Sequence, residues 1–199
     1  MENVILYSAI GSNSSERVEW VLNFKGITYS RVEVESSELK TSFLAINPFG
    51  YVPVISIDGY LISESIAIIE CVEELNPSPS ILGKHWEESA SIREICEYVN
   101  STIHAPQNRT VLSTLRPELS ESAKKEFRGN WMTHTLAILS SRLWLVSDYA
   151  VGGDFSLADI FVATVYKKAR QHGAKPIRKF EQHLDWLRGH KLIAASEPK

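Results

Sequence analysis

Apolar positions in the first third of the chain switch between the spacing of strands and the spacing of helices. Residues 4–7 form a short apolar run that predicts a buried strand, and a polar turn around Gly11 separates this run from a helical pattern. The helical pattern ends at Lys25-Gly26, and residues 29–34 then alternate apolar and polar side chains like a half-buried strand. The chain therefore opens with a β-α-β order.

A hairpin and a helix complete this part of the chain. Residues 52–57 predict a strand, residues 60–62 predict its partner, and the Asp-Gly pair between them is a strong hairpin signal. A helical pattern begins at residue 63 or 64 and continues to about Leu75. This order predicts a mixed sheet flanked by helices.

Pro53 lies inside the predicted strand, although proline has no N–H to donate to a strand ladder. We therefore expect Pro53 at the start of the strand, with its nitrogen facing a cleft. A cis Val52–Pro53 bond would suit this position, but only about one X–Pro bond in twenty is cis, so composition does not establish it.

The rest of the chain is predicted to be helical. The Pro- and Ser-rich segment at 76–80 is the clearest linker, and the turns beyond it contain Gly or Pro. We expect a first domain over 1–78, a linker over 79–85 and an all-α domain over 86–199. Helical patterns cover 87–113, 119–147, 157–172 and 177–188.

Composition and charge exclude several classes of protein. The hydrophobic fraction of 44% and charged fraction of 23% are those of a globular protein, and a net charge of -3 gives no reason to expect nucleic acid or an anionic membrane as partner. No apolar stretch approaches the roughly 18 to 20 residues that span a bilayer, and the start does not resemble a signal peptide. Two cysteines, Cys71 and Cys96, fit a reducing compartment. We expect a cytoplasmic protein.

Motifs for several kinds of chemistry are absent. The chain has no Cys-x-x-Cys, His-Glu-x-x-His, phosphate-binding glycine loop or Gly-x-Gly-x-x-Gly, and its six histidines lack metal-ligand spacing. We therefore expect no metal.

The order of these segments resembles the thioredoxin-like domain of the cytosolic glutathione transferases. The resemblance is carried by the Ser-rich turn after the first strand, the helix ending in Lys-Gly-Ile, the run Asn-Pro-Phe-Gly-Tyr-Val-Pro at 47–53, the hairpin, and Ser-Glu-Ser at 63–65. It extends over nearly the whole chain, since Phe155-Ser156-Leu-Ala-Asp159 is similar to the family's helix-capping box. It implies an α/β thioredoxin-like domain followed by an all-α domain, glutathione as the only cofactor, and a homodimer.

Within that family the chain most resembles the zeta class, whose best-known member is maleylacetoacetate isomerase. The run from Ser12 to Val18 has the layout of the class motif Ser-Ser-Cys-x-x-Arg-Val, with Asn13 and Ser14 in place of the second Ser and the Cys. Gln107-Asn108 is similar to a second segment of the class, and Glu64 stands where the class has Gln. The arginine that binds acidic substrates in the class has no aligned counterpart here, because Arg170 is displaced by one position.

Ser12 is the candidate that the resemblance makes catalytic. A thiol like that of glutathione has a pKa near ~8.5, and a hydroxyl donor at a helix N-terminus favours its thiolate. Ser12 lies between the first strand and the first helix, and Ser14 and Asn13 are the alternates. Without the resemblance, the serines of this turn would be read as caps of the helix.

The remaining expected contacts bind the peptide of glutathione. The free backbone of Val52, beside Pro53, can pair with the cysteinyl residue as an added strand. Ser65 and the first N–H groups of its helix can hold the γ-glutamyl carboxylate. Three further contacts are expected: Glu64 on the γ-glutamyl ammonium, as acidic residues do in many transferases, Lys40 on the glycyl carboxylate, and Gln107 from the helical domain. The alternative for Glu64 is a favourable charge at a helix N-terminus, and the alternative for Lys40 is a solvated surface lysine.

The leading hypothesis is an enzyme that adds glutathione thiolate to a small electrophile, by conjugation or by zeta-type cis-trans isomerisation. The same fold also serves as a non-catalytic docking module, which would have little reason to keep Ser12, Val52-Pro53 and Glu64-Ser65 together. A glutathione-dependent reductase or peroxidase usually requires a catalytic cysteine, and neither cysteine lies in the Ser12 turn.

Overall fold

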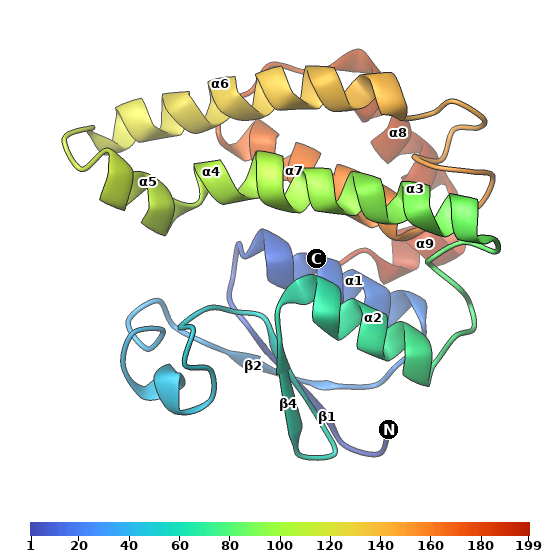
Figure 1. The fold of residues 1–199 in the computed structure, drawn as a ribbon, viewed down its shortest axis with the longest axis horizontal. Coiled ribbons are helices and arrows are strands. Elements are labelled where there is room, and N and C mark those ends of the chain that lie inside the picture. Colours follow the sequence, from blue (N-terminus) through green and yellow to red (C-terminus); the bar gives the residue numbers. More distant parts are fainter. The chain divides into compact units, whose positions relative to one another are not determined.

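The computed structural model describes residues 1–199, which form two compact units. The first unit comprises Met1–Ser80 together with Lys191–Lys199, and the second comprises Ile81–His190. Figure 1 shows the elements of both units.

A four-stranded mixed sheet forms the centre of the first unit. Its order is β2-β1-β3-β4, with β1 parallel to β2 and antiparallel to β3, and β3 antiparallel to β4. This confirms the predicted β-α-β order and hairpin. The strands are β1 Val4–Ser8, β2 Ser30–Glu33, β3 Val54–Ile57 and β4 Tyr60–Ser63.

The hairpin turn has the backbone that an Asp-Gly pair favours. Asp58 has φ 50° and Gly59 has φ 89°, the positive values that a two-residue hairpin loop requires. The Asp58 carboxylate also accepts hydrogen bonds from the N–H groups of Glu2 and Asn3 at 3.0 and 2.8 Å. These bonds, that from Asn3 first, lower the pKa of Asp58 and join the turn to the start of the chain.

Three helices accompany the sheet: α1 Asn13–Phe24, α2 Ser65–Leu75 and α9 Lys191–Ser196. Helices α1 and α2 lie side by side over one face of the sheet (Figure 1). Leu6 and Ile55 of the sheet and Val21 and Ile68 of the helices are fully buried, so apolar burial holds the layers together.

Helix α9 returns from the end of the chain to pack on α1. The indole N–H of the buried Trp20 donates to Ser196 Oγ at 3.1 Å, and the Asn23 amide donates to the Ser196 carbonyl at 3.0 Å. The first bond satisfies the buried indole N–H, and Ser196, which is also buried, accepts both.

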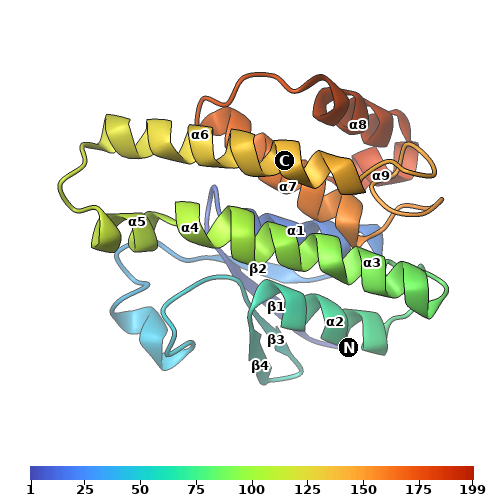
Figure 2. The same cartoon turned by 45° about the horizontal axis from the view of Figure 1, so that its top comes forward.

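The second unit is all-helical, as predicted. Its helices α3 and α6 run side by side in opposite directions in both views (Figure 1 and Figure 2), and α7 packs against both. Every side chain from Leu157 to Tyr166 is buried, which makes α7 the core of the unit. The elements are α3 Trp86–Glu97, the π-helical segment Tyr98–His104, α4 Ala105–Gln107, α5 Arg109–Leu115, α6 Glu121–Leu139, the 3-10 turn Ser140–Arg142, α7 Leu157–Gln171 and α8 Arg178–Gly189.

Two predicted helices were too long. The pattern over 87–113 breaks at Asn108, whose ψ of 135° is not helical and whose Oδ1 accepts from the Thr110 N–H at 2.9 Å, so that Asn108 caps a new helix. The pattern over 119–147 ends at Leu139: a 3-10 turn follows, and the backbone leaves the helical region at Leu143 (ψ 155°) and Trp144 (φ 56°). The ring of Trp144 packs edge-on against Phe180 at 5.0 Å, a contact that periodicity does not reveal.

Asp159 holds the start of α7 in place. Its Oδ2 accepts from the N–H and hydroxyl of Ser156 at 2.8 and 3.1 Å, which confirms the predicted capping role. Its Oδ1 accepts from the Ala150 N–H at 2.7 Å and lies 2.8 Å from His183 Nε2. One buried carboxylate therefore joins the helix start, the preceding loop and α8.

None of the helices combines the length and apolar character of a membrane-spanning segment.

We predict that Asp159→Ala lowers the free energy of unfolding of the helical unit by about 3 kcal/mol or more, because it leaves buried donors without an acceptor. Urea unfolding followed by circular dichroism measures this change. Asp154→Ala removes an exposed carboxylate that pairs with Lys84 at 2.5 Å in the same unit and should have no measurable effect. Equal effects of the two variants would show that Asp159 does not hold the start of α7 in place.

Candidate functional site

The strand register brings three predicted segments to one end of the sheet. Tyr7 of β1 lies opposite Val54 of β3, and Val54 lies opposite Ser63 of β4. The turn that follows β1, the residues that precede β3 and the residues that follow β4 therefore start from neighbouring positions. These segments contain Ser12, Val52-Pro53 and Glu64-Ser65.

Ser12 is the N-cap of α1, with an extended backbone and a half-buried side chain. Its Oγ accepts two hydrogen bonds, from the Ser15 N–H at 3.3 Å and from the Ser15 hydroxyl at 2.9 Å. A hydroxyl oxygen has two lone pairs and one proton. Because both lone pairs are engaged by Ser15, the proton of Ser12 is left to donate to another group.

The two alternates differ in their surroundings. Asn13 is buried, and its Oδ1 accepts from Arg17 Nη2 at 2.7 Å, whereas its Nδ2 has no hydrogen-bond partner. Ser14 is half-buried, and its hydroxyl makes no hydrogen bond. Asn13 is thus turned toward Arg17, while Ser14 keeps a free hydroxyl in the first turn of α1.

The Val52–Pro53 bond is cis, and β3 begins directly after it at Val54, the strand-start position expected for this proline. No hydrogen bond engages the backbone of Val52. The turn before it is held by buried Asn47, whose amide donates to the Tyr51 carbonyl at 2.7 Å. Val52 thus presents an N–H and a carbonyl that an extended peptide can pair with.

Glu64 precedes α2 in an unusual backbone conformation. Its φ is 70° and its ψ is 120°, values that cost a non-glycine residue on the order of 1–3 kcal/mol and that gather at functional sites. The Glu64 side chain is exposed and does not cap α2. Ser65 is buried, and the first N–H groups of this 11-residue helix have no side-chain acceptor. N–H groups in this position at the start of a helix can bind an anion.

Lys40 lies on the loop between β2 and β3, which also contains the short 3-10 helix Ser42–Ala45. Its side chain is exposed and enters no ion pair. Gly50 has φ +68°, and a Cβ there would lie 2.9 Å from the Leu39 carbonyl oxygen. This close approach joins the Lys40 turn to the segment that leads into Val52.

Gln107 belongs to the helical unit. It is buried at the end of α4, with its Nε2 3.2 Å from His104 Nδ1. Its expected contact with glutathione remains a prediction.

Sequence reasoning treated Ser15 only as part of a serine-rich cap. The structure shows that Ser15 is buried and donates its hydroxyl proton to Ser12. Ser15 stands three residues after the N-cap, the spacing at which a cap and its partner meet, so the spacing could have indicated this bond.

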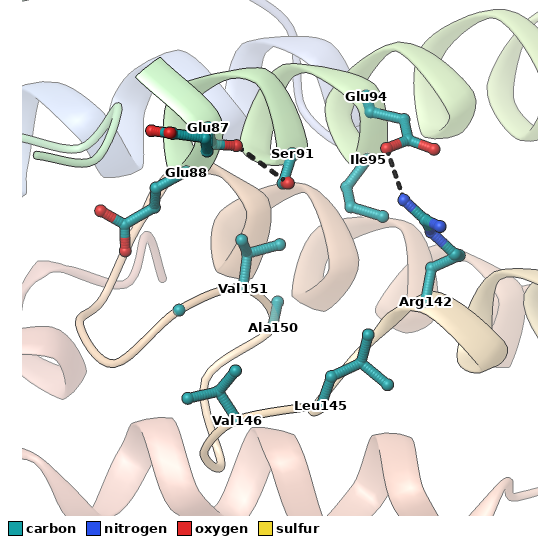
Figure 3. Close-up of a pocket in the computed structure, with 11 residues that line it drawn as sticks. Glu87, Glu88, Ser91, Glu94, Ile95, Arg142, Leu145, Val146, Ala150 and Val151 are labelled. Atoms are coloured by element: carbon teal, nitrogen blue, oxygen red, sulfur yellow. Dashed lines mark hydrogen bonds and ion pairs between the residues drawn. The ribbon is translucent and has the colours of Figure 1, made fainter. Parts of the chain in front are cut away.

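The helical unit has a cavity of about 290 Å³ of its own (Figure 3). The apolar side chains of Ile95, Leu145 and Val146 line it, and Arg142 at its rim pairs with Glu94 at 2.8 Å. None of the predicted site residues lies there. No group of three or more potential metal-ligating side chains occurs in the structure.

Comparisons with known proteins identify relatives over most of the chain. The sequence profile of the family described as "Glutathione S-transferase, N-terminal domain" matches residues 6–80. A protein named "Probable maleylacetoacetate isomerase 2" from Drosophila melanogaster is 32% identical over 175 residues, covering 84% of this chain and 75% of the fly protein.

Solved structures agree with these relatives. The holo structure of a bacterial zeta-class maleylpyruvate isomerase has a TM-score of 0.89 at 25% identity, covering 98% of this chain and 96% of that one. The maleylacetoacetate isomerase of Anaeromyxobacter dehalogenans, with glutathione in its active site, has a TM-score of 0.84 at 27% identity, covering 98% and 95%. The same protein with dicarboxyethyl glutathione and citrate bound has a TM-score of 0.83 at 27% identity, covering 98% and 91%.

We predict that Gly50→Ala destabilises the first unit more than Gly59→Ala does. Both glycines have positive φ, which costs an L-residue about 1–2 kcal/mol, but only a Cβ at Gly50 meets a backbone carbonyl. The added overlap should cost a further 1–3 kcal/mol or so, which thermal or urea unfolding measures. Equal destabilisation would mean that the loop carrying Lys40 is not held against Gly50.

Proposed function

Because the chain belongs to the zeta class of the glutathione transferase superfamily, we propose that it binds glutathione at the β1-β3-β4 end of its sheet and presents the thiolate to a small electrophile. The observation that supports this most directly is the Ser12 hydroxyl, which stands at the N-terminus of α1 with both lone pairs occupied and its proton available.

This arrangement suits the stabilisation of a thiolate. A thiol with a pKa near ~8.5 is only a few per cent ionised at neutral pH, and lowering its pKa by ~2 units requires about 2.7 kcal/mol. A hydrogen bond to a charged acceptor contributes about 1.5–3 kcal/mol, and a helix N-terminus adds about 0.3–1 kcal/mol. Together these contributions are of the size required. Ser15 fixes the direction of the donated proton because it occupies the other two positions on Ser12 Oγ.

The peptide of glutathione has partners in the same unit. The unpaired backbone of Val52 receives the cysteinyl residue as an added strand, with Pro53 shaping the loop. Ser65 and the open start of α2 receive the γ-glutamyl carboxylate, and the exposed Glu64 receives the γ-glutamyl ammonium. We assign the glycyl carboxylate to Lys40 and a contact from the helical unit to Gln107.

Two reactions share the same first step. The thiolate sulfur bonds to one carbon of an electrophilic double bond, and the π electrons move onto the neighbouring conjugated carbonyl. In conjugation, the adduct takes up a proton and leaves. In cis-trans isomerisation, the new single bond rotates, the electron pair returns and the thiolate departs, so glutathione is recovered unchanged. The isomerase names of the relatives favour the second outcome for this chain. By resemblance we also propose that the protein acts as a homodimer.

We predict that Ser12→Ala slows turnover by ~10-fold or more with a modest change in glutathione affinity, because the lost bond acts on the sulfur rather than on the peptide. Turnover of maleylacetone and of chlorodinitrobenzene, with calorimetry of glutathione binding, separates the two effects.

Ser120→Ala is the matched control, since Ser120 caps α6 by accepting from the Ala123 N–H at 3.2 Å. It loses a cap of the same kind and should keep full turnover. Unaltered turnover in Ser12→Ala, with loss in Ser14→Ala or Asn13→Ala, would move the role to that residue. No glutathione binding at millimolar concentration would instead favour a non-catalytic docking module.

We predict that Glu64→Ala weakens glutathione binding about 10-fold, because the γ-glutamyl ammonium loses a charged acceptor worth about 1.4 kcal/mol. Glu64→Gln should retain more affinity, since the amide keeps an acceptor oxygen. Glu74→Ala removes the same charge from an exposed position near the other end of α2 and should bind like the wild type. Isothermal calorimetry distinguishes the three, and equal affinities in all of them would remove Glu64 from the site.

A further inference from the structure

Cationic side chains gather where α6 approaches the end of α7. A Cβ on Gly129 of α6 would lie 2.6 Å from the carbonyl oxygen of His172, which follows α7, so the two backbones are very close there. Burial, together with the nearby Lys168, Arg128 and Lys125, lowers the pKa of His172 to about 4. All three charged groups that act on this ring are positive.

Arg128 is the unusual member of this group. It is only 8% exposed, and its Nη2 is buried without a hydrogen-bond partner. Its guanidinium forms no ion pair with any carboxylate of the chain. Arginine is rarely buried unless it is paired.

Glu121, an acid on which Arg128 acts, does not offset this excess of positive charge. Glu121 pairs with Lys124 at 3.1 Å, and its side chain is 69% exposed. Its pKa is lowered first by the bond from Lys124, and Arg128 has a smaller effect on it. Glu121 thus pairs with the buried Lys124 and leaves the Arg128 guanidinium without a partner.

The end of a helix is too weak to substitute for an anion. The stabilisation that a cation gains near a helix C-terminus is small, even when the cation is partly buried. The penalty for burying a charge without a partner is larger. The difference favours a bound anion, and the planar guanidinium matches the two oxygens of a carboxylate or phosphate.

We propose that a small oxyanion group, a carboxylate or a phosphate, binds between α6 and the end of α7, with Arg128 as its main partner and the exposed Lys125 at its entrance. The site lies wholly within the helical unit and uses none of the residues assigned to glutathione. It is therefore independent of the proposed function.

The test uses the full chain with sulfate and malonate as probes, in thermal unfolding and calorimetry at constant ionic strength set with sodium chloride. We expect a dissociation constant of about 1 mM or lower for at least one probe, with a rise in the unfolding midpoint as the site fills. Arg128→Met should weaken that binding by at least ~10-fold. Arg128→Lys should retain part of the affinity, because lysine keeps the positive charge but lacks the paired N–H donors of the guanidinium. Arg116→Met removes one exposed arginine that pairs with Glu118 at 2.5 Å and should bind like the wild type.

A second readout locates the anion. Sulfate should shift the imidazole signals of His172 in the wild type and in Arg116→Met, and leave them unchanged in Arg128→Met. A response to sulfate alone supports a phosphate-bearing ligand, and a response to malonate alone supports a carboxylate. The proposal is overturned if chloride has the same effect as both probes, or if Arg128→Met, folded as judged by circular dichroism, binds them like the wild type.

Discussion

The pairing of β3 between β1 and β4 is the constraint on which the candidate site depends. Tyr7, Val54 and Ser63 lie opposite one another in this register, so three segments distant in sequence leave the sheet at the same end. A shift by one residue would reverse the faces of every side chain on the shifted strand. The hairpin turn at Asp58-Gly59 and the apolar strand residues buried against α1 and α2 therefore also determine where Ser12, Val52 and Glu64 lie.

The groups that meet there share one property: each lacks a partner that the protein itself could provide. The Ser12 hydroxyl proton has no acceptor, the Val52 backbone has no strand beside it, and the start of α2 has no side-chain cap. Glu64 is also held at a positive φ. Unpaired or strained groups of this kind cost stability in the free protein, and they are the features on which the proposed glutathione site rests.

Two buried charged side chains in the helical unit, Asp159 and Arg128, differ in whether they have hydrogen-bond partners. Asp159 is completely buried, and its two carboxylate oxygens accept three hydrogen bonds and contact His183. Arg128 is almost as deeply buried, and no acceptor of the chain meets it. The first arrangement fits a structural anchor, and the second fits a site that is completed by something outside the chain.

Local signals in the sequence determined the elements, because they act over a few residues. Alternating apolar positions and the Asp-Gly pair established the strands, and the Ser156-Asp159 spacing established the start of α7. The positions of Ser12, Val52 and Ser65 were predicted, although their grouping came from resemblance to a family. Tertiary structure decided what depends on contacts between distant residues: the packing of Trp144 after the end of α6, the packing of α9 on Trp20, and the isolation of Arg128. No periodicity encodes these features, because each depends on which surfaces meet after the chain has folded.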